Sequence, residues 1–188
     1  MKIPVVDNGG QWTHREWRVL RDLGVESRIV PNTTPLAELD ADGVVLSGGA
    51  LSLEGSDAPL GRVGDWIGSA EVPVLGICVG HQFLARQFGG RVRHAAHPEF
   101  GRVELSVDAP EHPLFAGLPT TLQVWESHND DVDRVPDGWT ALAHSAGCPV
   151  QAMAHPTRPI FGVQFHPEVV HTEGGRELLQ HFAALCRR

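Results

Sequence analysis

The sequence predicts an α/β fold in which a mostly parallel sheet carries helices on both faces and continues into an antiparallel extension. In the first half of the chain, short apolar or β-branched runs alternate with helix-like segments, which is the rhythm of βαβ units. From Arg102 onward, strand-like runs follow one another closely, separated by loops that contain Asp, Asn, Pro and Gly. We find no internal repeat, linker or low-complexity stretch, so we expect one domain over residues 1–188.

The composition is that of a soluble globular protein. Of its 188 residues, 41% are hydrophobic and 20% are charged, and no apolar run approaches the roughly 20 residues of a membrane span. The net charge of −8, without an obvious basic face, argues against a nucleic-acid partner. The N-terminus lacks a signal-peptide pattern, and the three cysteines are widely spaced, so we expect free thiols in the cytoplasm.

The first half of the chain supplies the expected parallel strands and their helices. The strand-like runs cover residues 2–6, 27–30, 43–47 and 72–78. After Gln11, one face of a helix holds the apolar residues Trp12, Val19, Leu20 and Leu23. We expect this helix to end near Gly24, since glycine favours helix C-termini. Residues 81–88 are compatible with another helix.

The second half of the chain predicts closely spaced strands and a final helix. The strand-like runs cover residues 102–107, 121–125, 139–145, 150–155 and 160–165. The final helix is indicated by the helical spacing of Leu178, Leu179, Phe182, Leu185 and Cys186. Cys186 is therefore expected to pack or to end the helix, and Cys148, in a turn before proline, is also expected to be structural.

Cys78 stands where the expected strand meets the expected helix, in the stretch "LGICVGHQFL". Gly76 and Gly80 flank it in a G-x-C-x-G pattern, similar to the elbow that exposes a nucleophile on a tight strand-to-helix turn. The start of the following helix would stabilise a thiolate, and the N–H of Val79 can point at an oxyanion. A buried cysteine that ends a core strand is the alternative for this stretch.

His166 is the histidine best placed by its sequence context to serve as a general base. Four of the eleven histidines precede proline, and only His155 and His166 among them end an apolar run. Pro167 favours an extended chain at His166, which places Glu168 on the same side as the imidazole. His155 lacks such a carboxylate and is the weaker candidate, while a simple turn is the alternative for "HPE".

The stretch "VVLSGGA" leads a buried-type strand into Gly48 and Gly49. Adjacent glycines expose backbone N–H groups, which either supply a donor to an oxyanion hole or make a tight turn. The sequence lacks a phosphate-binding loop. His94 and His97 form a weak pair of potential metal ligands without a convincing companion, so we expect no metal site.

These three elements, in this order, resemble the S-G-G, G-x-C-x-G-x-Q and H-P-E patterns of the class I, or triad-type, glutamine amidotransferases, whose fold is flavodoxin-like. The resemblance spans nearly the whole chain. Further stretches resemble the glutaminase chains of GMP synthetases of the archaeal, two-subunit type: "VVDNGGQWTHREWR", "PNTTPL", "ESHNDDV" and "RPIFGVQFHPEVVHTEGG".

The resemblance implies that the chain hydrolyses L-glutamine to glutamate and ammonia. In that family pattern, Cys78 attacks the side-chain amide, His166 moves protons and Glu168 orients His166. The N–H groups of Gly49 and Val79 would hold the oxyanion. Substrate binding would fall to Gly48, Gln82, Ser127 and His128.

The resemblance also implies a partner, a separate ATP-pyrophosphatase subunit that uses ATP and Mg²⁺ to convert XMP to GMP, with no cofactor on this chain. The alternatives are a glutaminase subunit for another acceptor, an elbow-cysteine hydrolase or glyoxalase-like chaperone, and a non-enzymatic scaffold. Ala50 stands where the family usually has proline, which is expected to loosen the loop, and residues 51–60 also depart from the family pattern. Asp130 and Asp131 are expected either to pair with basic groups of the partner or to form a solvated acidic loop.

Overall fold

The structure is a computed structural model that describes residues 1–55 and 60–187. Its described strands form one sheet in the order β2-β1-β3-β4-β9-β8-β7-β5-β6. The parallel part consists of β1 (Val5–Asp7), β2 (Ile29–Pro31), β3 (Val44–Leu46), β4 (Val74–Ile77) and β9 (Ile160–Val163). The antiparallel part consists of β5 (Arg91–Val107), β6 (Thr121–Arg134), β7 (Thr140–Ser145) and β8 (Ala152–Ala154).

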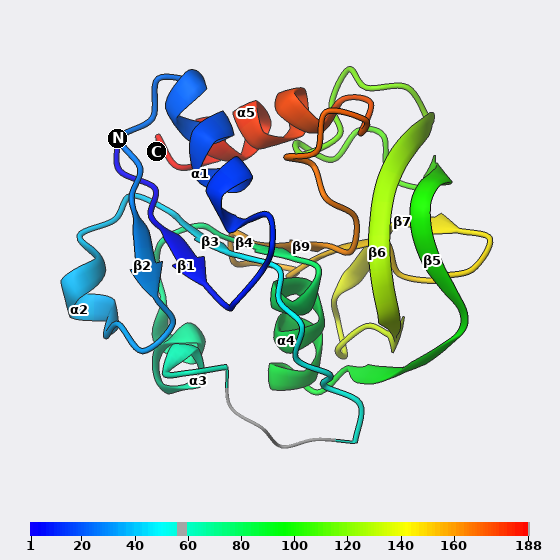
Figure 1. Ribbon diagram of the computed structural model, residues 1–188, viewed down its shortest axis with the longest axis horizontal. Coiled ribbons are helices and arrows are strands. Elements are labelled where there is room, and N and C mark those ends of the chain that lie inside the picture. Colours follow the sequence, from blue (N-terminus) through cyan, green and yellow to red (C-terminus); the bar gives the residue numbers. More distant parts are fainter. Residues whose placement is uncertain (56–59, 188) are drawn as a thin grey trace.

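Helices cover both faces of the parallel part, as the sequence predicts (Figure 1). One face carries α1 (Thr13–Asp22) and α5 (Gly175–Leu185), and the other carries α3 (Val63–Trp66) and α4 (Val79–Gln87). The short helix α2 (Leu36–Leu39) and the 3₁₀ turn Ile67–Ser69 complete the described helical segments. Successive strand residues point to opposite faces, so Val5 packs in the core under α1 and α5 while Val6 packs in the core under α4.

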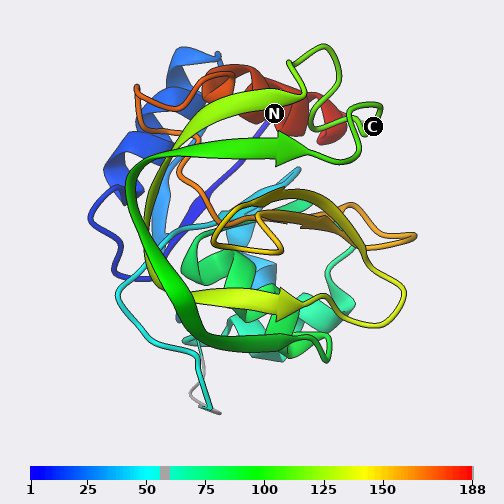
Figure 2. The ribbon, with the colours of Figure 1, turned by 90° about the vertical axis from the view of Figure 1, so that its right-hand side faces the viewer.

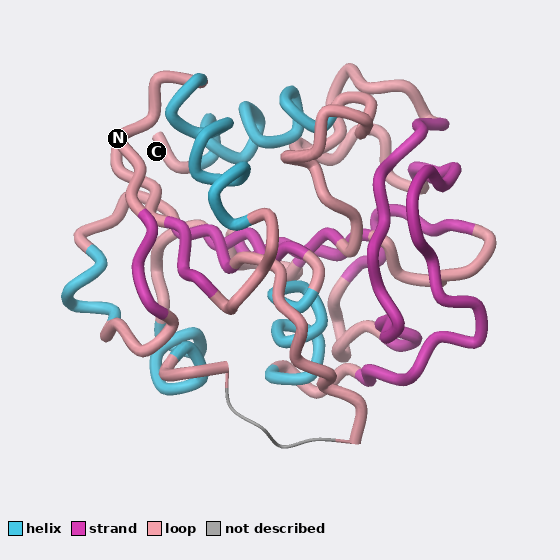
Figure 3. The backbone as a smooth tube through the Cα atoms, in the orientation of Figure 1, coloured by secondary structure: helices cyan, strands magenta, loops and turns pink. Residues whose placement is uncertain are grey.

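The predicted α/β class with an antiparallel extension is confirmed, and the secondary-structure tube shows the two parts joined through β9 (Figure 3). The apolar run predicted at 160–165 contributes β9, which pairs parallel with β4 and antiparallel with β8. The helix expected after Gln11 is α1, and it ends before Gly24, whose φ is +77°. No helix in the described part of the chain has the length and apolar character needed to cross a bilayer.

The antiparallel part differs from the prediction at two places. Strand β5 begins at Arg91 rather than Arg102, and β6 continues to Arg134, so both strands are long and lie side by side (Figure 2). The register shifts between His94 and Glu99, and such a bulge tolerates Pro98, which has no N–H to donate to a ladder. The early part of β5 was not predicted as a strand because its sequence is polar and contains this proline.

Candidate active site

Cys78 occupies a sharp turn between β4 and α4. Its φ of 51° and ψ of −108° are unusual for a residue with a side chain. The flanking glycines are required by space: a Cβ at Gly76 would lie 2.6 Å from the carbonyl carbon of Gly80, and a Cβ at Gly80 would lie 2.5 Å from the backbone oxygen of Leu46. This turn therefore has the geometry of a nucleophile elbow and places Cys78 at the start of a helix.

His166 and Glu168 form a buried pair beside this turn. Their Nδ1 and Oε1 atoms are 2.7 Å apart, and the imidazole of His166 lies beside Cys78. Burial alone would lower the pKa of His166, but the charge of Glu168 and the contact with Cys78 raise it well above its ordinary value. The arrangement favours an imidazolium beside the sulfur, which is the partner that a thiolate needs.

The loop after β3 approaches both residues. A Cβ at Gly48 would lie 3.2 Å from Cε1 of His166 and 3.6 Å from Cβ of Cys78. The loop is held by the segment after β1, because the N–H of Asn8 donates to Ser47 Oγ over 2.9 Å and its side-chain amide donates to Ser47 O over 2.8 Å. A side chain at Gly49 would collide with Asn8 O, at 2.5 Å, so this close packing requires glycine. These contacts hold Ser47 and Gly49, the residues that precede Ala50.

A cavity of about 410 Å³ opens over Cys78. Its walls include seven of the predicted site residues: Gly48, Gly49, Cys78, Gln82, Ser127, His128 and His166. Glu168 lies behind His166 and Val79 lies at the start of α4, and neither side chain lines the cavity. The volume is in the range of small-molecule sites and is large enough for an amino acid.

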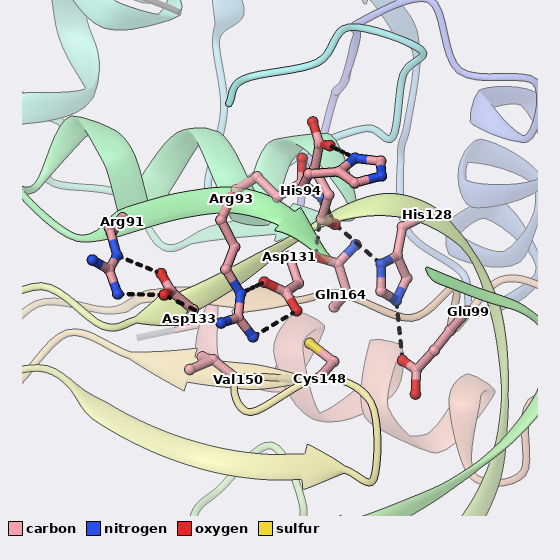
Figure 4. A network of polar contacts seen from close by, with 12 residues as sticks. Arg91, Arg93, His94, Glu99, His128, Asp131, Asp133, Cys148, Val150 and Gln164 are labelled. Atoms are coloured by element: carbon pink, nitrogen blue, oxygen red, sulfur yellow. Dashed lines mark hydrogen bonds and ion pairs between the residues drawn. The ribbon is translucent and has the colours of Figure 1, made fainter. Parts of the chain in front are cut away.

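Gln82 and His128 use their side chains to hold the wall of the cavity. Gln82 Nε2 donates to the backbone oxygen of Asp130 over 2.7 Å and to Gln164 Oε1 over 3.1 Å. The ring nitrogens of His128 lie 3.0 Å from Asp130 O and 3.1 Å from Glu99 Oε2 (Figure 4). Because both ring nitrogens have protein partners, His128 is left with its backbone groups to offer a ligand.

The acidic stretch at Asp130 and Asp131 is not the solvated loop that was one expectation. It lies in β6, and the exposed fractions of these residues are 7% and 0%. Asp131 accepts a hydrogen bond from Arg93 over 3.0 Å (Figure 4). Asp130 contacts His94 and Ser52. The basic partners therefore come from this chain, and the carboxylates brace the cavity wall. Of residues 51–60, positions 56–59 lie outside the described residues.

The other candidate residues lie away from the cavity. His155 packs against Trp139 and Phe88, with ring centroids 5.1 and 5.8 Å away. Cys148 and Cys186 are buried, which raises the pKa of Cys148 strongly and that of Cys186 to about 12. Among the described residues, no cluster of three potential metal ligands includes His97, and His94 occurs in one with Glu54 and Asp130.

Two further residues, which were not predicted at the site from the sequence, line the cavity: Trp12, just before α1, and Glu16, in α1. The indole of Trp12 meets the His166 ring edge to face, with centroids 4.4 Å apart. Glu16 lines the cavity and is 1% exposed. Glu16 follows Trp12 by one helical turn, so a glutamate on the apolar face of the expected helix was the available signal.

Comparison with known proteins agrees with this geometry. Residues 4–186 match the family model "Glutamine amidotransferase class-I". The chain is 54% identical to a subunit of the glutamine-hydrolyzing GMP synthase from Thermoplasma acidophilum, over 99% of this chain and 93% of that protein. It is 48% identical to the subunit of the same name from Picrophilus torridus, over the full length of both chains.

Solved structures support the same assignment. A crystal structure of a GMP synthase subunit from Thermoplasma acidophilum superposes with a TM-score of 0.92 at 53% identity, covering 99% of this chain and 94% of that one. A glutamine amidotransferase from Thermotoga maritima shares the fold, with a TM-score of 0.80 at 19% identity, covering 100% of this chain and 99% of that one. The chain belongs to the class I glutamine amidotransferases.

Proposed function

We propose that this chain hydrolyses L-glutamine to glutamate and ammonia through a triad of Cys78, His166 and Glu168. The observation that carries the proposal is the position of Cys78 on its strained turn, in contact with a histidine that a buried carboxylate holds at 2.7 Å. An amide is a weak electrophile with a poor leaving group. Its hydrolysis needs a strong nucleophile, a proton donor and stabilisation of the oxyanion.

The reaction proceeds in two halves. The sulfur of Cys78 bonds to the amide carbon, and the carbonyl electron pair moves to oxygen. When the tetrahedral species collapses, its carbon–nitrogen bond breaks and His166 gives a proton to the departing nitrogen, which leaves ammonia and a thioester. Water then loses a proton to His166 and attacks the thioester carbon, and the carbon–sulfur bond breaks to release glutamate. Glu168 keeps the imidazole oriented throughout.

The neighbouring backbone supplies the remaining interactions. The N–H groups of Gly49 and Val79 are the proposed donors to the oxyanion, one from the loop after β3 and one from the start of α4. Gly48, Gln82, Ser127 and His128 are proposed to bind the amino-acid end of glutamine. For His128 this contact comes from the backbone, since its ring is already bonded to Glu99 and Asp130.

We further propose that the ammonia passes to a separate ATP-pyrophosphatase subunit that converts XMP to GMP. Relatives about half identical to this chain carry the name of one subunit of a GMP synthase, which supports the existence of a second. ATP and Mg²⁺ would act on that partner, while this chain uses no cofactor of its own. We expect the complex to work in the cytoplasm, and nucleic acid and membranes to play no part.

The test measures glutamate release from glutamine, first with the chain alone and then with the partner subunit, ATP and XMP. We expect slow release alone, faster release with the partner, formation of GMP, and loss of activity after treatment with a glutamine-analogue alkylator. No glutamate under either condition would overturn the hydrolysis proposal. Glutamate release without GMP would overturn only the acceptor, and a rate already maximal without the partner would overturn only the stimulation.

A further inference from the structure

Glu16 is a buried carboxyl group at the site that the proposed mechanism does not use. It lies on α1 with 1% of its surface exposed, and its Oε1 accepts a hydrogen bond from the N–H of Gly48 over 3.3 Å. Its Oε2 has no hydrogen-bond partner. Side-chain ligand atoms of Glu16, His166 and Glu168 all lie within 4.8 Å of one another. A second carboxyl group thus faces the histidine and contacts the loop beside it.

The surroundings of Glu16 favour its neutral form. Burial, followed by the charge of Glu168, raises the pKa of Glu16 well above its ordinary value, while His166 and the Gly48 N–H oppose the shift and Cys78 adds to it. A neutral carboxyl group still accepts hydrogen bonds through its carbonyl oxygen. Burying a polar group costs free energy that leucine or methionine would avoid at this position, so packing alone does not explain a glutamate.

The hydrogen bond to Glu16 restrains the N–H of Gly48, and the hydroxyl of Ser47 donates to the Gly48 carbonyl over 2.9 Å on the other side of the residue. Asn8 holds Ser47, the residue before, through two hydrogen bonds. Gly48 and Gly49 have no side chains to limit their dihedral angles, and glycine adopts many backbone conformations. The orientation of the Gly48 amide determines how the chain continues to Gly49, whose N–H is a proposed oxyanion donor.

We propose that Glu16 is a positioning residue of the glutaminase site. The carbonyl oxygen of its side-chain carboxyl group accepts a hydrogen bond from the N–H of Gly48, and this contact orients the Gly49 N–H toward the reacting carbonyl of the substrate. This inference rests on the proposed function. The interaction acts on the oxyanion rather than on the sulfur, so it affects the turnover of glutamine more than the reactivity of Cys78 toward a simple alkylating agent.

The test compares Glu16→Gln with Glu16→Leu and Glu16→Met in the full chain, assayed with the partner subunit, ATP and XMP. Glutamine keeps a carbonyl oxygen at the same place, so we expect kcat within about twofold of the parent. The two apolar variants leave the Gly48 N–H without its acceptor, and we expect kcat to fall about tenfold or more, with KM within about threefold. Glu177→Leu, an exposed glutamate on α5, is the matched control and should match the parent.

A second measurement separates loop positioning from general damage. The rate at which iodoacetamide alkylates Cys78, followed by mass spectrometry, should be unchanged in every folded variant. Full activity of the folded Glu16→Leu and Glu16→Met variants would overturn the inference. So would a loss of kcat in Glu16→Gln as large as in the apolar variants, or an alkylation rate that falls as much as kcat does. If the parent itself releases no glutamate, the proposed function fails as well, whereas an active parent with unaffected apolar variants refutes this inference alone.

Discussion

At the scale of single residues, the three free cysteines differ in how their thiols can react. Cys78 contacts His166, whereas burial raises the pKa of both Cys148 and Cys186. We expect Cys78→Ser and Cys78→Ala to abolish glutamine hydrolysis while circular dichroism remains unchanged. Cys148→Ser and Cys186→Ser should remain active in the same assay. Normal hydrolysis by Cys78→Ser would contradict the assignment of the nucleophile.

The two candidate histidines are also predicted to differ in turnover. His166→Ala removes the group proposed to carry protons, and we expect kcat to fall by about 10² or more. His155 packs between aromatic rings away from the cavity, so His155→Ala should change kcat by less than about threefold. Steady-state kinetics on both variants provide the check, and similar losses would argue against His166 as the base.

Glu168→Gln is expected to change the pH dependence as well as the rate. The charge of Glu168 raises the pKa of His166, so its removal should lower that pKa. The imidazolium is then lost at a lower pH, and the alkaline limb of the kcat profile should move in the same direction. The loss of turnover should lie between those of His166→Ala and His155→Ala. An unshifted limb would show that Glu168 does not set this pKa.

The residues of the proposed triad could be predicted from sequence because each stands in a short pattern with a local physical reason. Glycines flank Cys78, and Glu168 follows His166 by two positions on an extended chain. Glu16 could not be assigned in this way. Its importance depends on the packing of α1 against the loop after β3, and only the fold brings Glu16 within 3.3 Å of Gly48.

At the scale of elements, the contact between α4 and β3 is sensitive to a small substitution. A Cβ at Gly80 would lie 2.5 Å from Leu46 O and 3.0 Å from Leu46 Cβ, and backbone atoms cannot yield as a flexible side chain does. We therefore expect Gly80→Ala to lower the free energy of unfolding by about 2 kcal/mol. Urea denaturation checks this value, with Gly68→Ala, which meets no atom within 4 Å, as the control. Equal stability of the two variants would contradict the packing argument.

The elements with clear periodicity were predictable, and the start of β5 and the end of β6 were not. Apolar runs such as residues 43–47 and 72–78 contain β3 and β4 because burial on both faces demands continuous apolar side chains. Residues 127–134 of β6 are polar except Val132, and their strand conformation depends on partners from β5, such as Arg93 beside Asp131. Charge pairing between residues that are far apart in sequence leaves no periodic signal along either strand.

At the scale of the whole molecule, His81 is expected to couple stability to pH. It is fully buried on α4, where burial lowers its pKa from 6.5 to about 3. Between these values the unfolded chain takes up a proton that the folded chain does not, so stability falls as pH decreases from about 6.5 toward 3. The His81 contribution reaches at most about 1.4 kcal/mol per pH unit.

The measurement is urea denaturation of the parent and of His81→Gln at about pH 4.5, inside this range, and at about pH 6.5, at its upper end. Glutamine has no ionisable group, so the variant should lose less stability than the parent on acidification, even if it is less stable at the higher pH. Identical losses for both proteins would show that His81 protonates equally in the folded and unfolded chains.

The backbone dihedral angles of Cys78 also bear on the evolution of this position. A φ of 51° with a ψ of −108° suits glycine and costs a residue with a Cβ about 1–3 kcal/mol. Selection for folding stability alone would favour glycine at this position. A destabilising side chain at position 78 is consistent with selection for chemistry. Greater thermal stability and faster turnover therefore favour different residues at this position.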